Sequence, residues 1–125
     1  MVASSRDFFK EYAAALASFS AEKISEFYQT PLAIYSDNGV QIVNEMDEVV
    51  SFWEQGVKPY KKMDIDKAVP EALSEEQVSE KFFISKVLWK NYNKAGKEVA
   101  AETNLYILSG RESKMKISGL IIMTK

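Results

Sequence analysis

The sequence predicts an α+β fold, in which three N-terminal helices pack on a strongly curved, mixed and mostly antiparallel sheet. Three observations support this prediction. Two amphipathic helical stretches begin the chain, an Asn-Gly hairpin and a third helix follow them, and long strand-like segments fill the remainder to Met123. Helices that precede a curled sheet predict a cone, with a cavity between the helical layer and the sheet.

The first helix is expected to begin near Ser4 or Ser5, because either hydroxyl can cap a helix N-terminus. Its apolar side chains recur at spacings of four, four and three residues, which places them on one helical face. They are Phe8, Tyr12, Leu16 and Phe19.

The second helix is expected to begin after Ser20, with Glu22 in its first turn. It is expected to end at Pro31, because proline cannot continue a helix. Its apolar face would consist of Ile24, Phe27 and Tyr28.

Two short strands are predicted over residues 32–36 and 40–43, joined by Asp37-Asn38-Gly39. Asn38 and Gly39 are expected at the two central positions of a tight turn, since both tolerate positive φ. A third helix would then be capped by Asn44 and would end at Gly56. Glu45 and Asp47 would lie in its first turn, and its apolar side would be Val49, Val50, Phe52 and Trp53.

The last half of the chain is predicted to form the sheet. Residues 63–73 are expected to be an edge strand, because Pro70 has no amide hydrogen to donate to a neighbour. Residues 74–77 would be a polar turn. Residues 78–92 and 97–108 would be long strands joined by a three-residue loop, with Gly96 in the left-handed conformation. Residues 115–123 would be the final strand, apolar on both faces.

The loop at Gly96 predicts a register for the two long strands. The opposite pairs would be Trp89 with Ala101, Val87 with Thr103, Ser85 with Leu105, and Phe83 with Ile107. Cross-strand partners share a face of the sheet, and this face is uncharged, so we expect it to line the interior. The other face, with Lys86, Glu102 and Tyr106, is amphipathic. It predicts a second covering layer, most simply the same sheet of a second subunit.

Composition excludes several kinds of chemistry. The chain has no histidine and no cysteine, which removes thiol nucleophiles, Ser-His-Asp triads and ordinary zinc or copper sites. The net charge is −2 with both signs interspersed, so we expect no nucleic-acid partner. No apolar segment approaches the roughly 20 residues that a membrane span needs. We expect a single cytoplasmic domain over residues 1–125, without metal or cofactor.

These segments resemble the nuclear transport factor 2-like superfamily, in particular its SnoaL-like and ketosteroid-isomerase-like branch. The matching features are Phe27-Tyr28, Asn38-Gly39, Phe52-Trp53-Glu54-Gln55-Gly56, Trp89, Gly96 and Lys116-Ile117. Residues 57–80 match only loosely. The resemblance implies a cystatin-like cone. It does not specify an activity, because the superfamily contains isomerases, dehydratases, cyclases, epoxide hydrolases, non-enzymatic binders and dimerisation modules.

The ketosteroid isomerase pattern can be compared position by position. Tyr12 falls where that family has its oxyanion-donating tyrosine, Tyr28 on a supporting tyrosine, and Trp53 on a third tyrosine of the network. The general base, however, falls on Ser36, and the acidic oxyanion donor falls on Leu105. A serine without a partner base cannot abstract a proton beside a carbonyl, so the resemblance does not imply the isomerase reaction.

We therefore expect a SnoaL-like protein that binds a small, mainly apolar molecule in the cone cavity, as a homodimer through the outer sheet face. Two alternatives stay open. One is a cyclase- or isomerase-like enzyme that uses Tyr12 and a carboxylate not placed by the sequence, and the other is a structural dimerisation module with a filled cavity. The expected lining residues are Tyr12, Leu16, Tyr28, Ser36, Trp53, Phe83, Ser85, Val87, Trp89, Thr103 and Leu105.

Overall fold

A computed structural model describes residues 5–110 and 115–123. Its helices are α1 (Ser5–Ala17), α2 (Ala21–Ser25), α3 (Met46–Gly56) and α4 (Lys58–Lys62). Its strands are β1 (Tyr28–Ser36), β2 (Gly39–Val43), β3 (Ile65–Gln77), β4 (Phe82–Asn93), β5 (Glu98–Ser109) and β6 (Lys116–Met123). Within the described residues, the strands form one sheet in the order β2-β1-β6-β5-β4-β3.

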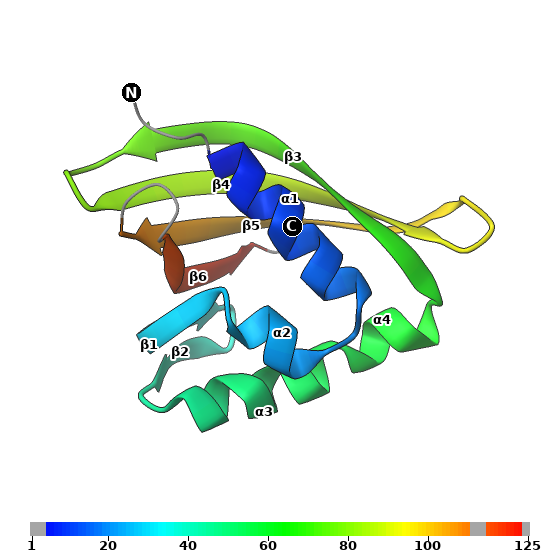
Figure 1. Cartoon of the computed structure of the whole chain (residues 1–125), viewed down its shortest axis with the longest axis horizontal. Helices are drawn as coiled ribbons and strands as arrows, with labels where there is room; N and C mark the ends of the chain where they lie inside the picture. The colour runs from blue at the N-terminus through cyan, green and yellow to red at the C-terminus, as the bar shows by residue number, and fades with distance from the viewer. Residues whose placement is uncertain (1–4, 111–114, 124–125) are drawn as a thin grey trace.

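The predicted architecture of helices on a curved mixed sheet is confirmed (Figure 1). The long strands β3, β4 and β5 curve across the top of the view, α1 crosses in front of them, α3 lies along the bottom, and α4 lies to its right and leads up to β3. Strands β1 and β6 are parallel, and the other neighbouring strands are antiparallel. None of the helices in the described part of the chain is long and apolar enough to cross a membrane.

The helices α1 and α2 follow the predicted pattern at their beginnings and depart from it at their ends. Tyr12 and Leu16 are buried, as expected for one apolar face, and a cap by Ser4 or by the Ser5 side chain lies outside the described part. The Ser20 hydroxyl caps α2 by accepting a hydrogen bond from the Lys23 amide at 3.2 Å. However, α2 ends at Ser25.

The prediction that Pro31 ends the second helix is wrong. Tyr28 already begins β1, and Pro31 lies inside this strand after a cis peptide bond. The proline is tolerated because the pairing of β1 with β6 is irregular between Tyr28 and Ala33, so no regular ladder donor is needed there.

The β1–β2 hairpin is present, but its turn lies one residue earlier than predicted. Ser36 pairs with Gly39, so Asp37 and Asn38 occupy the two central positions. Gly39 alone takes a positive φ, of 123°. The hairpin therefore uses glycine just after the turn rather than within it.

Helix α3 is capped by Glu45 rather than by Asn44. Glu45 and Glu48 form a capping box, in which the Glu48 carboxylate accepts from the Glu45 amide at 3.2 Å. The helix ends at Gly56 as predicted, but the short helix α4 follows directly and was not predicted. Pro59 favours this additional helix, because a proline in the first turn loses no helical hydrogen bond.

Strand β3 is an edge strand, as Pro70 indicated, but it is longer than expected. Residues 74–77, predicted to be a turn, continue the strand by pairing with residues 83–86 of β4. Strand β4 begins at Phe82, so the turn lies after Gln77 instead. Polar side chains on an exposed edge strand resemble those of a turn, which explains the error.

The predicted register of β4 and β5 is wrong by one residue. Gly96 has a φ of 83°, and the Asn93 amide donates to the Lys97 carbonyl at 2.9 Å, as the predicted loop requires. Beyond the loop, Asn91 pairs with Ala100 and Tyr92 pairs with Glu98, which leaves Val99 as an extra residue. This bulge shifts the remaining pairs to Trp89 with Glu102, Val87 with Asn104, Ser85 with Tyr106, and Phe83 with Leu108.

A shift of one residue moves each side chain of β5 to the opposite face. Glu102, Asn104, Tyr106 and Leu108 therefore share the inner face with Trp89 of β4, whereas Thr103, Leu105 and Ile107 lie on the outer face. Tyr106 and Leu108 are 2% and 0% exposed, consistent with the inner position. The change places a carboxylate where the predicted register had an uncharged surface.

Candidate functional site: a cavity between the helices and the sheet

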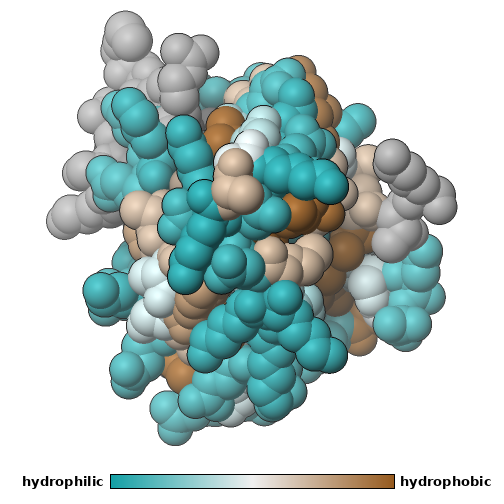
Figure 2. All heavy atoms as spheres, turned by 90° about the vertical axis from the view of Figure 1, so that its right-hand side faces the viewer, coloured by the Kyte–Doolittle hydropathy of each residue, from teal (hydrophilic) through white to brown (hydrophobic). Residues whose placement is uncertain are grey.

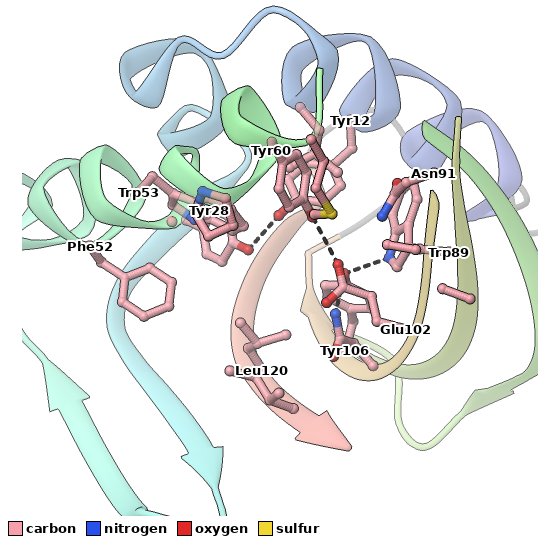
Figure 3. A pocket seen from close by; sticks show the side chains of 18 residues that line it. Tyr12, Tyr28, Phe52, Trp53, Tyr60, Trp89, Asn91, Glu102, Tyr106 and Leu120 are labelled. Atoms are coloured by element: carbon pink, nitrogen blue, oxygen red, sulfur yellow. Dashed lines mark hydrogen bonds between the residues drawn. The ribbon is translucent and has the colours of Figure 1, made fainter. Parts of the chain in front are cut away.

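A cavity of about 320 Å³ lies between the helices and the inner face of the sheet (Figure 3). Every helix except α2 contributes to its lining, together with strands β1, β4, β5 and β6. The lining residues are Tyr12, Leu16, Tyr28, Phe52, Trp53, Gly56, Pro59, Tyr60, Met63, Trp89, Asn91, Ala100, Ala101, Glu102, Asn104, Tyr106, Leu120 and Ile122. Seven of them are aromatic, so ring faces and edges dominate the walls.

Two tyrosines from distant elements meet at the inner end of the cavity. The hydroxyls of Tyr12 on α1 and Tyr28 at the start of β1 form a hydrogen bond of 2.5 Å. Trp89 and Trp53 flank them, with ring centroids 5.9 Å from Tyr12 and 6.1 Å from Tyr28, respectively. One hydroxyl hydrogen of the pair is used between the two tyrosines, which leaves the other for a further acceptor.

A third hydroxyl, that of Tyr106, is held by residues of strands β4 and β5. It accepts hydrogen bonds from Trp89 Nε1 at 2.8 Å and from Asn104 Nδ2 at 3.4 Å. Both bonds occupy acceptor positions of the oxygen, so the hydroxyl hydrogen of Tyr106 is available as a donor.

The carboxylate of Glu102 is the acidic group of the cavity. The hydroxyl of Tyr60, on α4, donates to Glu102 Oε1 at 2.9 Å, and Figure 3 shows the two side chains pointing toward each other. Glu102 is half-buried, and it is the one charged side chain among the described residues that line the cavity. The ion pairs within the described part of the chain join Glu71 with Lys90 and Asp64 with Lys94, so neither involves Glu102.

Burial keeps the tyrosines of the cavity in their neutral form. It is the main cause that raises the pKa of Tyr12, Tyr28 and Tyr106 above the ordinary value of 10. The pKa of Tyr60 is raised by burial first and then by the negative charge of Glu102. At neutral pH these four phenols are therefore hydrogen-bond donors and not bases.

Two amides beside the cavity are incompletely hydrogen-bonded. Asn91 is 2% exposed, and its Oδ1 atom has no partner among the described residues. The same holds for Asn104 Oδ1 and for Trp53 Nε1. Buried polar atoms without partners are uncommon in folded proteins, so their position around one cavity is informative.

Five of the predicted lining residues do line this cavity: Tyr12, Leu16, Tyr28, Trp53 and Trp89. Six do not. Phe83, Ser85 and Val87 are on the inner face of β4 but are buried in the core beyond the cavity. Ser36 is at the β1–β2 hairpin, where its hydroxyl accepts from the Asn38 amide at 3.2 Å. Thr103 and Leu105 lie on the outer face, because the bulge at Val99 reverses the side of β5 that faces inward.

The comparison with ketosteroid isomerase must be corrected at the same place. Leu105 cannot occupy the position of an oxyanion donor, because its side chain faces away from the cavity. The polar residues that face inward, Glu102, Asn104 and Tyr106, were missed together with Tyr60 and Asn91. Both alternating sets on β5 mix polar and apolar residues, so the hydrophobic pattern could not distinguish the two registers.

The helices on a curved sheet and the enclosed cavity define a cystatin-like cone, as predicted. A family profile described as "NTF2-like protein (DUF6841)" matches residues 3–124. The chain therefore belongs to this NTF2-like family, which confirms the predicted superfamily. No curated protein matches the chain in sequence.

Solved structures of similar shape agree with this assignment. A domain of unknown function with a cystatin-like fold from Nostoc punctiforme has 16% identity and a TM-score of 0.73, covering 96% of this chain and 74% of that one. An NTF-2 like protein of unknown function from Shewanella oneidensis has 13% identity and a TM-score of 0.70, covering 92% of each chain. A ketosteroid isomerase-like protein from Erwinia carotovora has 14% identity and a TM-score of 0.59, covering 92% and 90%. At these identities the likeness shows the fold alone.

Proposed function

We propose that the cone cavity binds a small molecule with an apolar body and at least one polar group. The observation that carries this proposal is the aromatic cavity of about 320 Å³. Ligand sites are typically concave and mainly apolar, with a few placed polar groups, and they begin at about 300 Å³. The cavity has this composition at the small end of that range.

The polar atoms around the cavity support a ligand rather than simple packing. Asn91 Oδ1 and Asn104 Oδ1 lack partners among the described residues, and a buried unpaired polar group costs about 1–3 kcal/mol. The Tyr106 hydroxyl hydrogen is also uncommitted, because both of its hydrogen bonds are accepted ones. A ligand whose polar group reaches these atoms would offset part of that cost.

The two tryptophans make this proposal directly testable. The chain has only Trp53 and Trp89, and both line the cavity, so their two indole N–H resonances in ¹H–¹⁵N NMR spectra report on it. We expect members of a fragment library to shift both resonances. The variant Ala100→Phe narrows the cavity and should abolish the shifts, whereas Ala95→Phe, in the exposed β4–β5 loop, should retain them. A library without any indole shift, or shifts unaffected by Ala100→Phe, would contradict the proposal.

A second candidate, a proton-transfer enzyme, is favoured by one specific observation. Glu102 places a carboxylate in the same cavity as the hydroxyl donors Tyr12, Tyr28 and Tyr106. A carboxylate that accepts a proton and a phenol that stabilises a developing oxyanion are the parts that proton abstraction beside a carbonyl needs.

Exchange of a ketone's α-hydrogens with solvent deuterium distinguishes a proton-transfer enzyme from a protein that only binds the ketone. Ketones that bind the cavity should exchange their α-hydrogens in D₂O faster with the wild-type protein than with Glu102→Gln, as followed by ¹H NMR. Equal rates for the two proteins at saturating ketone would exclude Glu102 as a catalytic base.

A further inference from the structure

We infer that the ligand of this cavity is a small organic amine, whose ammonium group pairs with Glu102 while its apolar part contacts the aromatic walls. The inference rests on the proposed binding function and names the class of molecule that the site recognises. Three features support it: the charge of the cavity, the unused acceptor capacity of Glu102, and the arrangement of the rings.

The charge of the cavity selects against anions. Its described lining contains one carboxylate and no lysine or arginine, so the formal charge of these lining residues is −1. An anionic ligand would have to approach Glu102 without a compensating cation, and like charges brought together at an interface repel each other. A cationic ligand would instead supply the opposite charge that the lining lacks.

The carboxylate of Glu102 retains acceptor capacity. An ionised carboxylate has about four lone-pair positions, and among the described residues Glu102 accepts a hydrogen bond from Tyr60. An ammonium group has three donor hydrogens and can pair with the remaining positions. Because Glu102 is half-buried, water screens this pairing less than it screens an exposed ion pair.

The rings provide the second half of an amine site. Seven aromatic side chains line the cavity, and Tyr60 is directly hydrogen-bonded to Glu102. A cation held by Glu102 therefore lies in a cavity walled mainly by aromatic rings, and ring faces attract cations. Combined carboxylate and ring contacts distinguish an ammonium group from a neutral hydroxyl.

The cavity also limits the size of the amine. A volume of about 320 Å³ accommodates roughly ten non-hydrogen atoms, at the roughly 30 Å³ that each water molecule occupies in the liquid. Suitable probes are therefore single-ring compounds of similar size that differ in charge: 2-phenylethylamine, 2-phenylethanol and 3-phenylpropanoate.

The test is a titration of each probe at pH 7, followed by the two indole resonances. We expect 2-phenylethylamine to bind about tenfold or more tightly than 2-phenylethanol, and 3-phenylpropanoate to bind most weakly. Glu102→Gln keeps the shape and an acceptor for Tyr60 but removes the charge, so it should abolish the preference for the amine. Glu98→Gln, an exposed position on the same strand, should leave the preference unchanged.

The outcomes separate the identity of the ligand from the existence of the site. If 2-phenylethanol binds as tightly as the amine, or if Glu102→Gln retains the preference, the amine inference is wrong while the binding function stands. If none of the three probes shifts an indole resonance at millimolar concentration, the amine inference is also wrong, and the fragment library decides whether the cavity binds anything. Circular dichroism of each variant verifies that it is folded.

Discussion

The two faces of strand β5 differ in chemistry although their residues alternate along one short segment. The inner face presents Glu102, Asn104 and Tyr106 to the cavity, and the outer face presents Thr103, Leu105 and Ile107. Each set contains polar and apolar members, so neither is obviously the core. The bulge at Val99 decides which set faces inward, and the comparison shows that one backbone irregularity can determine the chemistry of a site.

The two faces also differ in how their side chains are held. On the inner face, the Tyr106 hydroxyl accepts hydrogen bonds from the Trp89 indole and from the Asn104 amide. On the outer face, Ile107 lies close against Gly119 of β6, so that a Cβ atom added to Gly119 would lie 2.7 Å from Ile107 Cδ1. At one end of the molecule, Figure 2 shows mostly hydrophilic side chains, with hydrophobic ones visible in a recess between them.

The largest expected effect comes from changing the number of residues next to the bulge. Insertion of one alanine after Val99, with the single-residue bulge kept, would bring Ala101 opposite Trp89 and exchange the two faces of β5. Because this would bury Thr103 in place of Glu102 and expose Tyr106, we expect a loss of more than about 4 kcal/mol of stability, or no cooperative folding at all. Urea denaturation measures this loss.

The matched control is Val99→Ala, which keeps the number of residues in β5 and should cost far less than the insertion. An insertion variant as stable as Val99→Ala would show that the number of residues at the bulge does not determine the faces.

The second effect is the alkaline instability of the inner face. Burial raises the pKa of Tyr12, Tyr28 and Tyr106 above 10, so the folded chain retains protons that the unfolded chain releases above that pH. Their stabilisation is fully present below pH 10. Above it, each tyrosine removes up to ~1.4 kcal/mol per pH unit, until the pH passes its folded pKa.

Urea denaturation at pH 9, 10 and 11 measures this dependence. The double variant Tyr12→Phe/Tyr28→Phe should lose stability less steeply above pH 10, because only Tyr106 of the three still titrates. An unchanged slope would mean that these hydroxyls are not buried as described.

The sequence predicts the fold of this protein better than it predicts the polar residues of the cavity. The helices around Tyr12 and Trp53 and the edge strand containing Pro70 followed from periodicity and proline chemistry, which are local signals. The position of Glu102 depended on Val99, and a bulge in a strand of alternating mixed residues leaves no local signal. The sequence therefore predicted the cone and several of its aromatic walls, but it did not predict the charged group of the cavity.

The third effect tests the steric contact on the outer face. Gly119→Ala would place a methyl group 2.7 Å from Ile107 Cδ1 and 3.0 Å from Ile107 Cβ, so we expect a loss of about 1–3 kcal/mol. Ile107→Val removes Cδ1 and should recover part of the loss in the double variant. Strict additivity of the two single losses in urea denaturation would show that the residues are not in contact.

The smallest effect on the folding of one subunit is expected from the outer face of β5. The homodimer through this face stays a prediction, and the corrected register places Leu105 and Ile107 on it. Leu105→Lys should convert a dimer to a monomer in light-scattering measurements, with a change in secondary structure too small to detect by circular dichroism. A stable interface with a dissociation constant of about 1 µM or below would be fully formed at a protein concentration of about 100 µM. A wild-type protein that is still monomeric at that concentration would contradict the prediction.

The register of β4 and β5 is the central claim, and nuclear Overhauser effects measure it most directly. The structure predicts cross-strand contacts between the backbone protons of Trp89 and Glu102, and between the Trp89 indole N–H and the ring of Tyr106. Backbone contacts from Trp89 to Ala101 instead would restore the unbulged register. They would place Glu102 on the outer face and contradict both the acidic cavity and the amine inference.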